Sequence, residues 1–172
     1  GHLLHYHQHV EKMKQIIKSG GIGKIRYIEC SRKNLGIVRK EENVLWSFAP
    51  HDISIVLSLL GDQLPEKILC SGQKHLTKDV YDITNTTLKF TDNIFANISV
   101  NWMYPQKEQK IFVIGSTGIL LFDDTKHNLE KLQICNEYFT ENNTPNHTVR
   151  IANGSDLSDL GYFDVSHQTA KT

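Results

Sequence analysis

The chain has 172 residues, 22% of them charged, and its 19 basic side chains balance 19 acidic ones. This length suits one domain with its own core, and the zero net charge gives no reason to expect a nucleic acid or an anionic membrane as partner. No apolar run approaches the ~18–20 residues that cross a bilayer, and the first ten residues hold histidines where a signal peptide has a hydrophobic core. We therefore expect a cytoplasmic protein. The balanced charge remains compatible with a small neutral or mixed-charge ligand.

The chain opens with a helix and a strand. From His9 to Lys18 apolar residues recur at spacings of three and four, which predicts an amphipathic helix that ends at Gly20 and Gly21. From Lys24 to Asn34 the pattern alternates, as is typical of a strand. One face of this strand takes Arg26, Ile28, Cys30 and Arg32. Because Arg32 comes near the strand's end, we expect it at the rim of a sheet.

A second helix is predicted from Pro50 to Gly61. Proline is tolerated in the first turn of a helix, and Asp52 places a carboxylate where the helix dipole favours one. Apolar side chains fill most of the circumference of this segment. We therefore expect the helix to lie buried against a sheet.

The rest of the chain is rich in short strands. β-branched or aromatic runs separated by turn residues span 66–72, 82–90, 94–102, 109–115, 119–123 and 129–134. Strands that follow one another without helices predict an antiparallel sheet, so the fold class is α+β, with a large open sheet and helices on one face. The free face needs a cover, and we expect a homodimer or homotetramer through it.

The C-terminal part and the cysteines carry less information. After Asn136 the chain turns polar, and no pattern supports a structural prediction beyond Asn153. We divide the chain into a domain of residues 1–153 and a polar tail of residues 154–172. The cysteines are odd in number and form no CxxC pair, which predicts buried free thiols instead of disulfides or a zinc site; they are Cys30, Cys70 and Cys135.

His51 is the candidate for chemistry. It falls in the first turn of the predicted second helix, beside Asp52. Unpaired N–H groups at a helix start disfavour the protonated imidazolium form of a histidine, whereas a nearby carboxylate favours that form. A neutral imidazole beside a substrate hydroxyl can act as a general base. The alternative is a histidine that caps its helix and binds a backbone carbonyl.

Two further groups could bind ligands. Hydrogen-bond donors follow one another along the first strand and the loop after it: Arg26, Arg32, Lys33, Asn34, Arg39 and Lys40. Such donors suit a phosphorylated or uronic sugar. The alternative is that they form a solvated face. The N-terminal histidines could hold a metal, but the group lacks an acidic or cysteine partner, and an expression tag explains it more simply: His2, His5, His7 and His9. We predict no metal.

Familiar nucleotide and hydrolase motifs are missing. The chain has no GxGxxG after a strand, no P-loop and no Gly-x-Ser-x-Gly. Gly20 to Gly23 end a predicted helix instead. We therefore expect no cofactor bound by the chain itself.

Several segments resemble the Gfo/Idh/MocA oxidoreductases over roughly residues 1 to 135. They are residues 1–7 with the helix that follows, the Gly-x-(Ile/Leu)-Gly-Lys-Ile run into the first strand, and the His51-Asp52 motif opening a helix that ends at Gly61-Asp62. More narrowly, residues 31–36 and 39–54 resemble the branch that oxidises the 3-hydroxyl of UDP-N-acetylglucosaminuronic acid for surface-polysaccharide synthesis.

The resemblance implies that the chain corresponds to one of the two domains of such an enzyme. In that family a Rossmann domain binds NAD(P) and supplies a catalytic lysine, and the second half is an open sheet, like the C-terminal domain of dihydrodipicolinate reductase, that forms the oligomer interface. It implies a catalytic role for His51, in proton transfer with that lysine. It also makes other side chains candidates for the substrate's polar groups: Arg32, Asn34, Arg39, and Tyr6 or His7. The chain has Ser47 where the common motif has aspartate, which fits the sugar-nucleotide branch, and residues 156–172 lack the family's usual closing segment.

Two functions follow as hypotheses. In the first, the chain is the substrate-binding and oligomerisation part of an NAD(P)-dependent sugar dehydrogenase, and is inactive by itself. In the second, it is a non-catalytic oligomerisation or carbohydrate-binding module without a cofactor domain.

Overall fold

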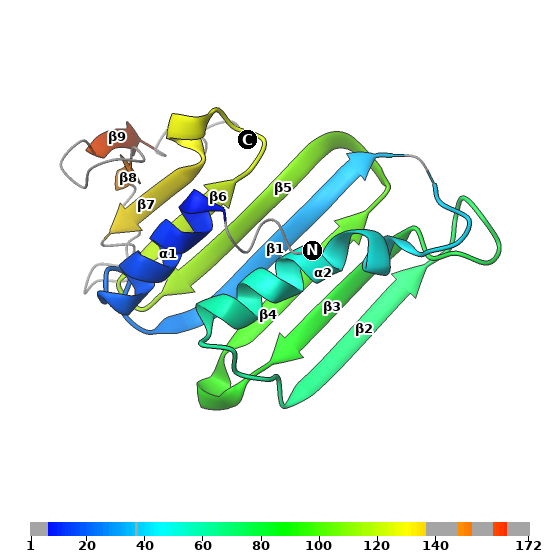
Figure 1. The fold of residues 1–172 in the computed structure, drawn as a ribbon, viewed down its shortest axis with the longest axis horizontal. Coiled ribbons are helices and arrows are strands. Elements are labelled where there is room, and N and C mark those ends of the chain that lie inside the picture. The colour runs from blue at the N-terminus through cyan, green and yellow to red at the C-terminus, as the bar shows by residue number, and fades with distance from the viewer. Residues whose placement is uncertain (1–6, 37, 137–147, 153–159, 165–172) are drawn as a thin grey trace, which may run out of the picture.

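A computed structural model describes residues 7–36, 38–136, 148–152 and 160–164. Within these ranges the chain forms one nine-stranded sheet and two α-helices, which lie on the same face of the sheet (Figure 1). The helices are α1 (Gln8–Lys18) and α2 (Val44–Leu59). The strands are β1 (Ile25–Leu35), β2 (Lys67–Gln73), β3 (Ile83–Lys89), β4 (Phe95–Asn101), β5 (Met103–Gly115), β6 (Gly118–Asp123), β7 (Leu132–Asn136), β8 (Thr148–Ala152) and β9 (Leu160–Asp164). The α+β prediction, with helices on one face, is confirmed.

The strand order is β2-β3-β4-β1-β5-β6-β7-β8-β9. Strands β1 and β4 run parallel, and all other neighbouring pairs are antiparallel. The turn at 91–93 joins β3 to β4, and a tight turn after Gly115 joins β5 to β6. The short turn signals in the sequence therefore define two hairpins, whereas β1 enters between them as a non-local strand.

The core lies between the helices and the sheet. The alternation of β1 places Ile28 and Cys30 under the helices, where both are fully buried. α1 covers the β6 side of the sheet, and α2 covers β4 and β1 (Figure 1). Their buried apolar stripes supply the helix half of the core: Val10, Met13 and Ile16 from α1, and Ile55, Val56 and Leu59 from α2.

The second helix begins earlier than the sequence predicts. α2 starts at Val44, and the side chain of Asn43 caps it by accepting a hydrogen bond from the Trp46 N–H at 3.0 Å. Pro50 therefore lies inside the helix, where its missing N–H leaves the carbonyl four residues earlier without its usual donor. The prediction of a helix start at Pro50 was wrong because a strong asparagine cap outweighed the proline signal.

The opposite face of the sheet is mixed in character. A row of hydrogen-bonded polar side chains crosses three strands there. Thr87 donates to Asn97 at 2.7 Å, Asn97 donates to the Tyr27 oxygen at 2.8 Å, and Tyr27 donates to Glu29. Burial, and then the bond to Glu29, raise the pKa of Tyr27 to about 12. Next to this row of polar side chains lie half-buried apolar side chains on β5 and β6, namely Phe112, Ile114, Ile119 and Leu121.

Other elements depart from expectation in detail. β5 begins at Met103, six residues before the predicted strand, and β7 starts later than predicted because a short 3-10 turn takes residues 128–130. β8 and β9 extend the sheet in a region where the sequence pattern predicts no strands.

Cys30 and Cys135 are buried as expected, whereas Cys70 is exposed on the edge strand β2. In the part of the chain that the structure describes, no helix is long and apolar enough to cross a membrane.

Candidate functional site

His51 lies on the eighth residue of α2, half-buried, one helical turn after Ser47. Residues four apart on a helix share a face, so His51 and Ser47 point to the same side of α2. This position corrects the electrostatic part of the sequence argument. Because α2 starts at Val44, His51 is beyond the first turn and the unpaired N–H groups of the helix start do not act on it directly.

The residue next to His51 is the centre of a buried ion pair. The Arg32 guanidinium donates from Nε to one carboxylate oxygen of Asp52 at 3.0 Å and from Nη2 to the other at 2.8 Å. The two residues are 7% and 1% exposed. Burial raises the pKa of Asp52, and the hydrogen bonds and charge of Arg32 oppose that rise. This two-point bond fixes β1 to α2 directly beneath the site.

A cavity of about 590 Å³ opens beside the first turns of α2. It is lined by the end of β1 and the loop after it, by α2 and by the residue between β4 and β5: Asn34, Leu35, Gly36, Arg39, Ser47, Phe48 and Trp102. The rings of Phe48 and Trp102 meet edge to face, with centroids 6.4 Å apart. Because Ser47 lines the cavity, His51 lies one turn from its wall.

Asn34 and Arg39 bring polar groups to this cavity. The side-chain oxygen of Asn34 is buried and has no hydrogen-bond partner among the described residues. Such an acceptor is costly when it is left without a donor. Arg39 is largely exposed and forms an ion pair with Glu42, three residues along the loop. Arg39 can therefore meet a ligand in the cavity as a cation, and Asn34 lines the wall of the cavity with an acceptor that lacks a donor.

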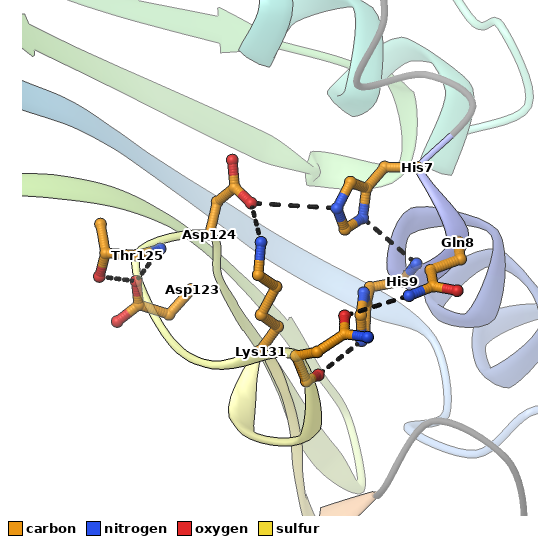
Figure 2. Close-up of polar contacts among 8 residues, drawn as sticks. His7, Gln8, His9, Asp123, Asp124, Thr125 and Lys131 are labelled. Atoms are coloured by element: carbon orange, nitrogen blue, oxygen red, sulfur yellow. Dashed lines mark hydrogen bonds and ion pairs between the residues drawn. The ribbon is translucent and has the colours of Figure 1, made fainter.

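His7 lies at the start of α1, where its ring accepts a hydrogen bond from the His9 N–H at 3.4 Å. Its Nε2 is 3.9 Å from Oδ1 of Asp124, and the same oxygen is 2.6 Å from Nζ of Lys131. Figure 2 shows the Asp124 carboxylate between the His7 ring and the Lys131 amine. Burial lowers the pKa of His7, an effect that Asp124 partly offsets.

The structure brings some sequence candidates together and separates others. Asn34 and Arg39 line one cavity, close to His51 on α2, whereas Arg32 is engaged below the helix and His7 is held at the start of α1. Tyr6 lies outside the described residues. No pattern in the sequence marked Phe48 and Trp102 as an aromatic wall, because an apolar residue near a helix start looks like ordinary core. Asp124 was not predicted either, and its one local signal is its place directly after a predicted strand.

The described residues offer no metal cluster, and their glycine-rich turn is not a dinucleotide-binding loop. Within those residues no three His, Cys, Asp or Glu side chains lie together so as to hold a metal ion, and His2 and His5 fall outside the described ranges. Gly20 and Gly23, with φ of 79° and 69°, end α1 and lead into β1. A phosphate-binding loop runs in the opposite order, from strand to helix. The residues present thus do not fit NAD(P) by this device.

Known proteins share this architecture. A family model described as the GFO/IDH/MocA C-terminal domain matches residues 10–121. No curated protein matches the chain.

Solved structures agree with the family model. An inositol dehydrogenase homolog from Azotobacter vinelandii, solved with NADH and myo-inositol, has a TM-score of 0.75 at 18% identity, over 94% of this chain and 43% of that one. An oxidoreductase from Pseudomonas syringae has a TM-score of 0.72 at 19% identity, over 84% and 43%. The UDP-N-acetylglucosamine 3-dehydrogenase GnnA from Acidithiobacillus ferrooxidans has a TM-score of 0.64 at 20% identity, over 78% and 40%. The chain thus spans less than half the length of these proteins, and the likeness is one of fold.

Proposed function

Because the chain belongs to the GFO/IDH/MocA family through its C-terminal domain, we propose that it is the substrate-binding and oligomerisation part of an NAD(P)-dependent sugar or sugar-nucleotide dehydrogenase. The observation that carries this proposal is the position of His51, one helical turn from a cavity with an unsatisfied acceptor and an exposed arginine. A cavity with a few convergent polar groups and an aromatic wall is typical of small-molecule sites.

We propose that the substrate is a UDP-N-acetyl-hexosaminuronic acid, oxidised at its 3-hydroxyl for surface-polysaccharide synthesis. The segments 31–36 and 39–54, which resemble that branch, form two walls of the cavity. One solved relative is named a UDP-N-acetylglucosamine 3-dehydrogenase. A uronate or diphosphate would suit Arg39, whose planar guanidinium binds such groups at two points.

The chemistry divides between this chain and its cofactor-bearing part. NAD(P), held outside the described residues, supplies the hydride acceptor. His51 takes the proton of the reacting hydroxyl, alone or with a lysine from the other domain, as a general base. Asn34 accepts a hydrogen bond from a sugar hydroxyl, Arg39 exchanges Glu42 for the anionic group of the substrate, and Trp102 shields the site from water. His7 and Tyr6 remain proposed substrate contacts from the segment before α1.

The open face of the sheet is the proposed oligomer interface. The half-buried apolar residues on β5 and β6 form a continuous patch by cross-strand pairing, with Phe112 opposite Leu121 and Ile114 opposite Ile119. Pairing with a second copy would remove this patch from water. We also propose that the protein acts in the cytoplasm, where nucleotide sugars and NAD(P) are available.

Substrate binding can be tested on the chain by itself. We expect UDP-N-acetylglucosaminuronic acid to shift the amide NMR signals of residues around the cavity, and Arg39→Ala and Asn34→Ala to raise the Kd about tenfold. Arg26→Ala is the matched control, because Arg26 is an exposed arginine at the opposite end of β1. Binding that depends on Arg26 and not on Arg39, or no shift at the cavity, would contradict the proposed site.

A further inference from the structure

Among the described residues, Arg32 lies in the interior and its guanidinium is engaged by a carboxylate. It stands on the helix face of β1, in register with the buried Val100 of β4. Both carboxylate oxygens of Asp52 accept hydrogen bonds from its Nε and Nη2, and the side chain is 7% exposed. A ligand that used this guanidinium would first have to displace a buried carboxylate, and that carboxylate would then be left unpaired.

The charge of a second acidic group also acts on Arg32. Gln109 of β5 pairs with Arg32 in the sheet, and the backbone N–H of Asp124 donates to the carbonyl of Gln109 at 2.9 Å. Burial by itself would lower the pKa of Arg32, but the bonds and charge of Asp52, followed by the charge of Asp124, raise it overall. The guanidinium therefore stays charged under the influence of two carboxylates, Asp52 on α2 and Asp124 directly after β6.

Each of these carboxylates is tied to a histidine-bearing segment. Asp52 directly follows His51 on α2. Asp124 lies 3.9 Å from His7, the residue that caps α1, and is held in place by Lys131 at 2.6 Å (Figure 2). His51 adjoins Asp52 in the sequence, and His7 lies near Asp124, so the two histidines neighbour the two carboxylates whose charges act on Arg32.

We propose that Arg32 is a positioning residue, which sets the orientation of the segments that carry His51 and His7 and does not bind substrate. The inference rests on the proposed function for the meaning of the two histidines, but its geometry stands without it. Arginine suits the task because its rigid fork makes two bonds at once, whereas a lysine ammonium is a single charge on a flexible stem. Such precision matters at a catalytic group, since a misplacement of about 1 Å can cost on the order of 100-fold in rate.

The decisive variant is Arg32→Lys, which keeps the charge and loses the fork. Two readouts are taken on the chain at one fixed pH: the ring carbon and nitrogen NMR signals of His51 and His7, and the Kd for UDP-N-acetylglucosaminuronic acid. We expect the His51 ring signals to move while the Kd stays within twofold of wild type. Arg26→Lys, an exposed change on the same strand, should leave both readouts unchanged.

Arg39→Lys separates a positioning role from direct binding. It should raise the Kd about tenfold without moving the His51 ring signals. If Arg32→Lys raises the Kd as much as Arg39→Lys does, Arg32 is a substrate ligand and the inference is overturned. If the ring signals of His51 stay in place in folded Arg32→Lys, the residue is only a structural brace, and the inference fails as well.

A second variant guards against a fold that does not tolerate Arg32→Lys. Asp124 is partly exposed, so Asp124→Asn should fold, and it removes a charge that acts on both Arg32 and His7. We expect it to move the ring signals of His7 and, through Arg32, those of His51. Unchanged His51 ring signals would contradict the proposed influence of Asp124 on His51 through Arg32. A chain that binds no sugar but shows these ring shifts would overturn the proposed function and leave the positioning role standing.

Discussion

Arg32 donates from Nε and Nη2 to the two carboxylate oxygens of Asp52, at 3.0 and 2.8 Å, inside the layer between the helices and the sheet. This pair joins the central strand β1 to the helix that carries His51. A buried pair of this kind is costly to break, because the partner that stays behind is an uncompensated charge. The sequence places Arg32 among the candidate substrate donors, and in the structure both carboxylate oxygens of Asp52 accept hydrogen bonds from it.

Removing one member of this pair should cost more than removing both. We expect Arg32→Met to lower the free energy of unfolding by about 3–5 kcal/mol, because Asp52 is left buried without a partner. Arg32→Met/Asp52→Leu replaces the pair with apolar side chains and should recover most of that loss. Urea denaturation of the three chains measures the difference. A double variant that is less stable than the single one would contradict this account of the pair.

The cap of α2 is a separate contribution to stability. Asn43→Ala removes the acceptor of the Trp46 N–H and should lower the free energy of unfolding by about 1 kcal/mol. Glu41→Ala, at an exposed position in the same loop, serves as the control and should change it by less than about 0.5 kcal/mol. Equal effects of the two substitutions in thermal or urea denaturation would show that Asn43 does not act as the cap.

The histidines at α1 should make the fold sensitive to acid. Burial lowers the pKa of both His7 and His9 below 6.5, so the unfolded chain takes up these protons first as the pH falls. Their contribution to stability is complete above about pH 6.5 and is lost as the pH falls toward the folded-state pKa values. We expect the free energy of unfolding to drop over this window.

Substitution identifies the groups responsible. His9→Gln should flatten the fall in stability below pH 6.5, since His9 is 4% exposed and its ring stacks near Phe122. His127→Gln, at an exposed position, should leave the slope as it is in wild type. A wild-type stability that rises on acidification through this window would show that burial does not hold the two imidazoles neutral.

The proposed oligomer interface makes a prediction about mass in solution. Leu121→Lys places a charge in the apolar patch of β5 and β6 and should weaken self-association about 30-fold or more, the effect of losing a central interface contact. Leu129→Lys changes an exposed leucine outside the sheet and should leave association unaltered. Analytical ultracentrifugation measures both. A wild-type chain that is monomeric at high concentration would rule out this interface.

Local patterns predicted the parts of the fold that depend on neighbouring residues. The alternation from Lys24 to Asn34 placed Ile28, Cys30 and Arg32 on one face of β1, and the helical period identified α1 to within a residue. The start of α2 was misplaced because two local signals, Asn43 and Pro50, competed. No pattern revealed the parallel pairing of β1 with β4, since that register depends on strands brought together from far apart in the chain.

The candidate site could be predicted only in part, for the same reason. The run of donors in the sequence includes Arg39 and Asn34, and the structure places both at a cavity one helical turn from His51. The engagement of Arg32 by Asp52 depends on how α2 lies across β1, and the approach of Asp124 to His7 depends on where β6 ends beside α1. Neither contact follows from composition or spacing, because each joins elements that meet only in the folded sheet.

The most direct measurement is the rate of NAD+ reduction when the chain is joined to a nucleotide-binding domain of this family and supplied with UDP-N-acetylglucosaminuronic acid. The wild-type fusion should reduce NAD+, and His51→Ala should lower kcat about 100-fold or more, the usual contribution of a general base. His75→Ala, on a different part of the chain, should leave kcat unchanged. Sugar binding without NAD+ reduction would favour a non-catalytic carbohydrate-binding module, and an unchanged kcat in His51→Ala would contradict the catalytic role of His51.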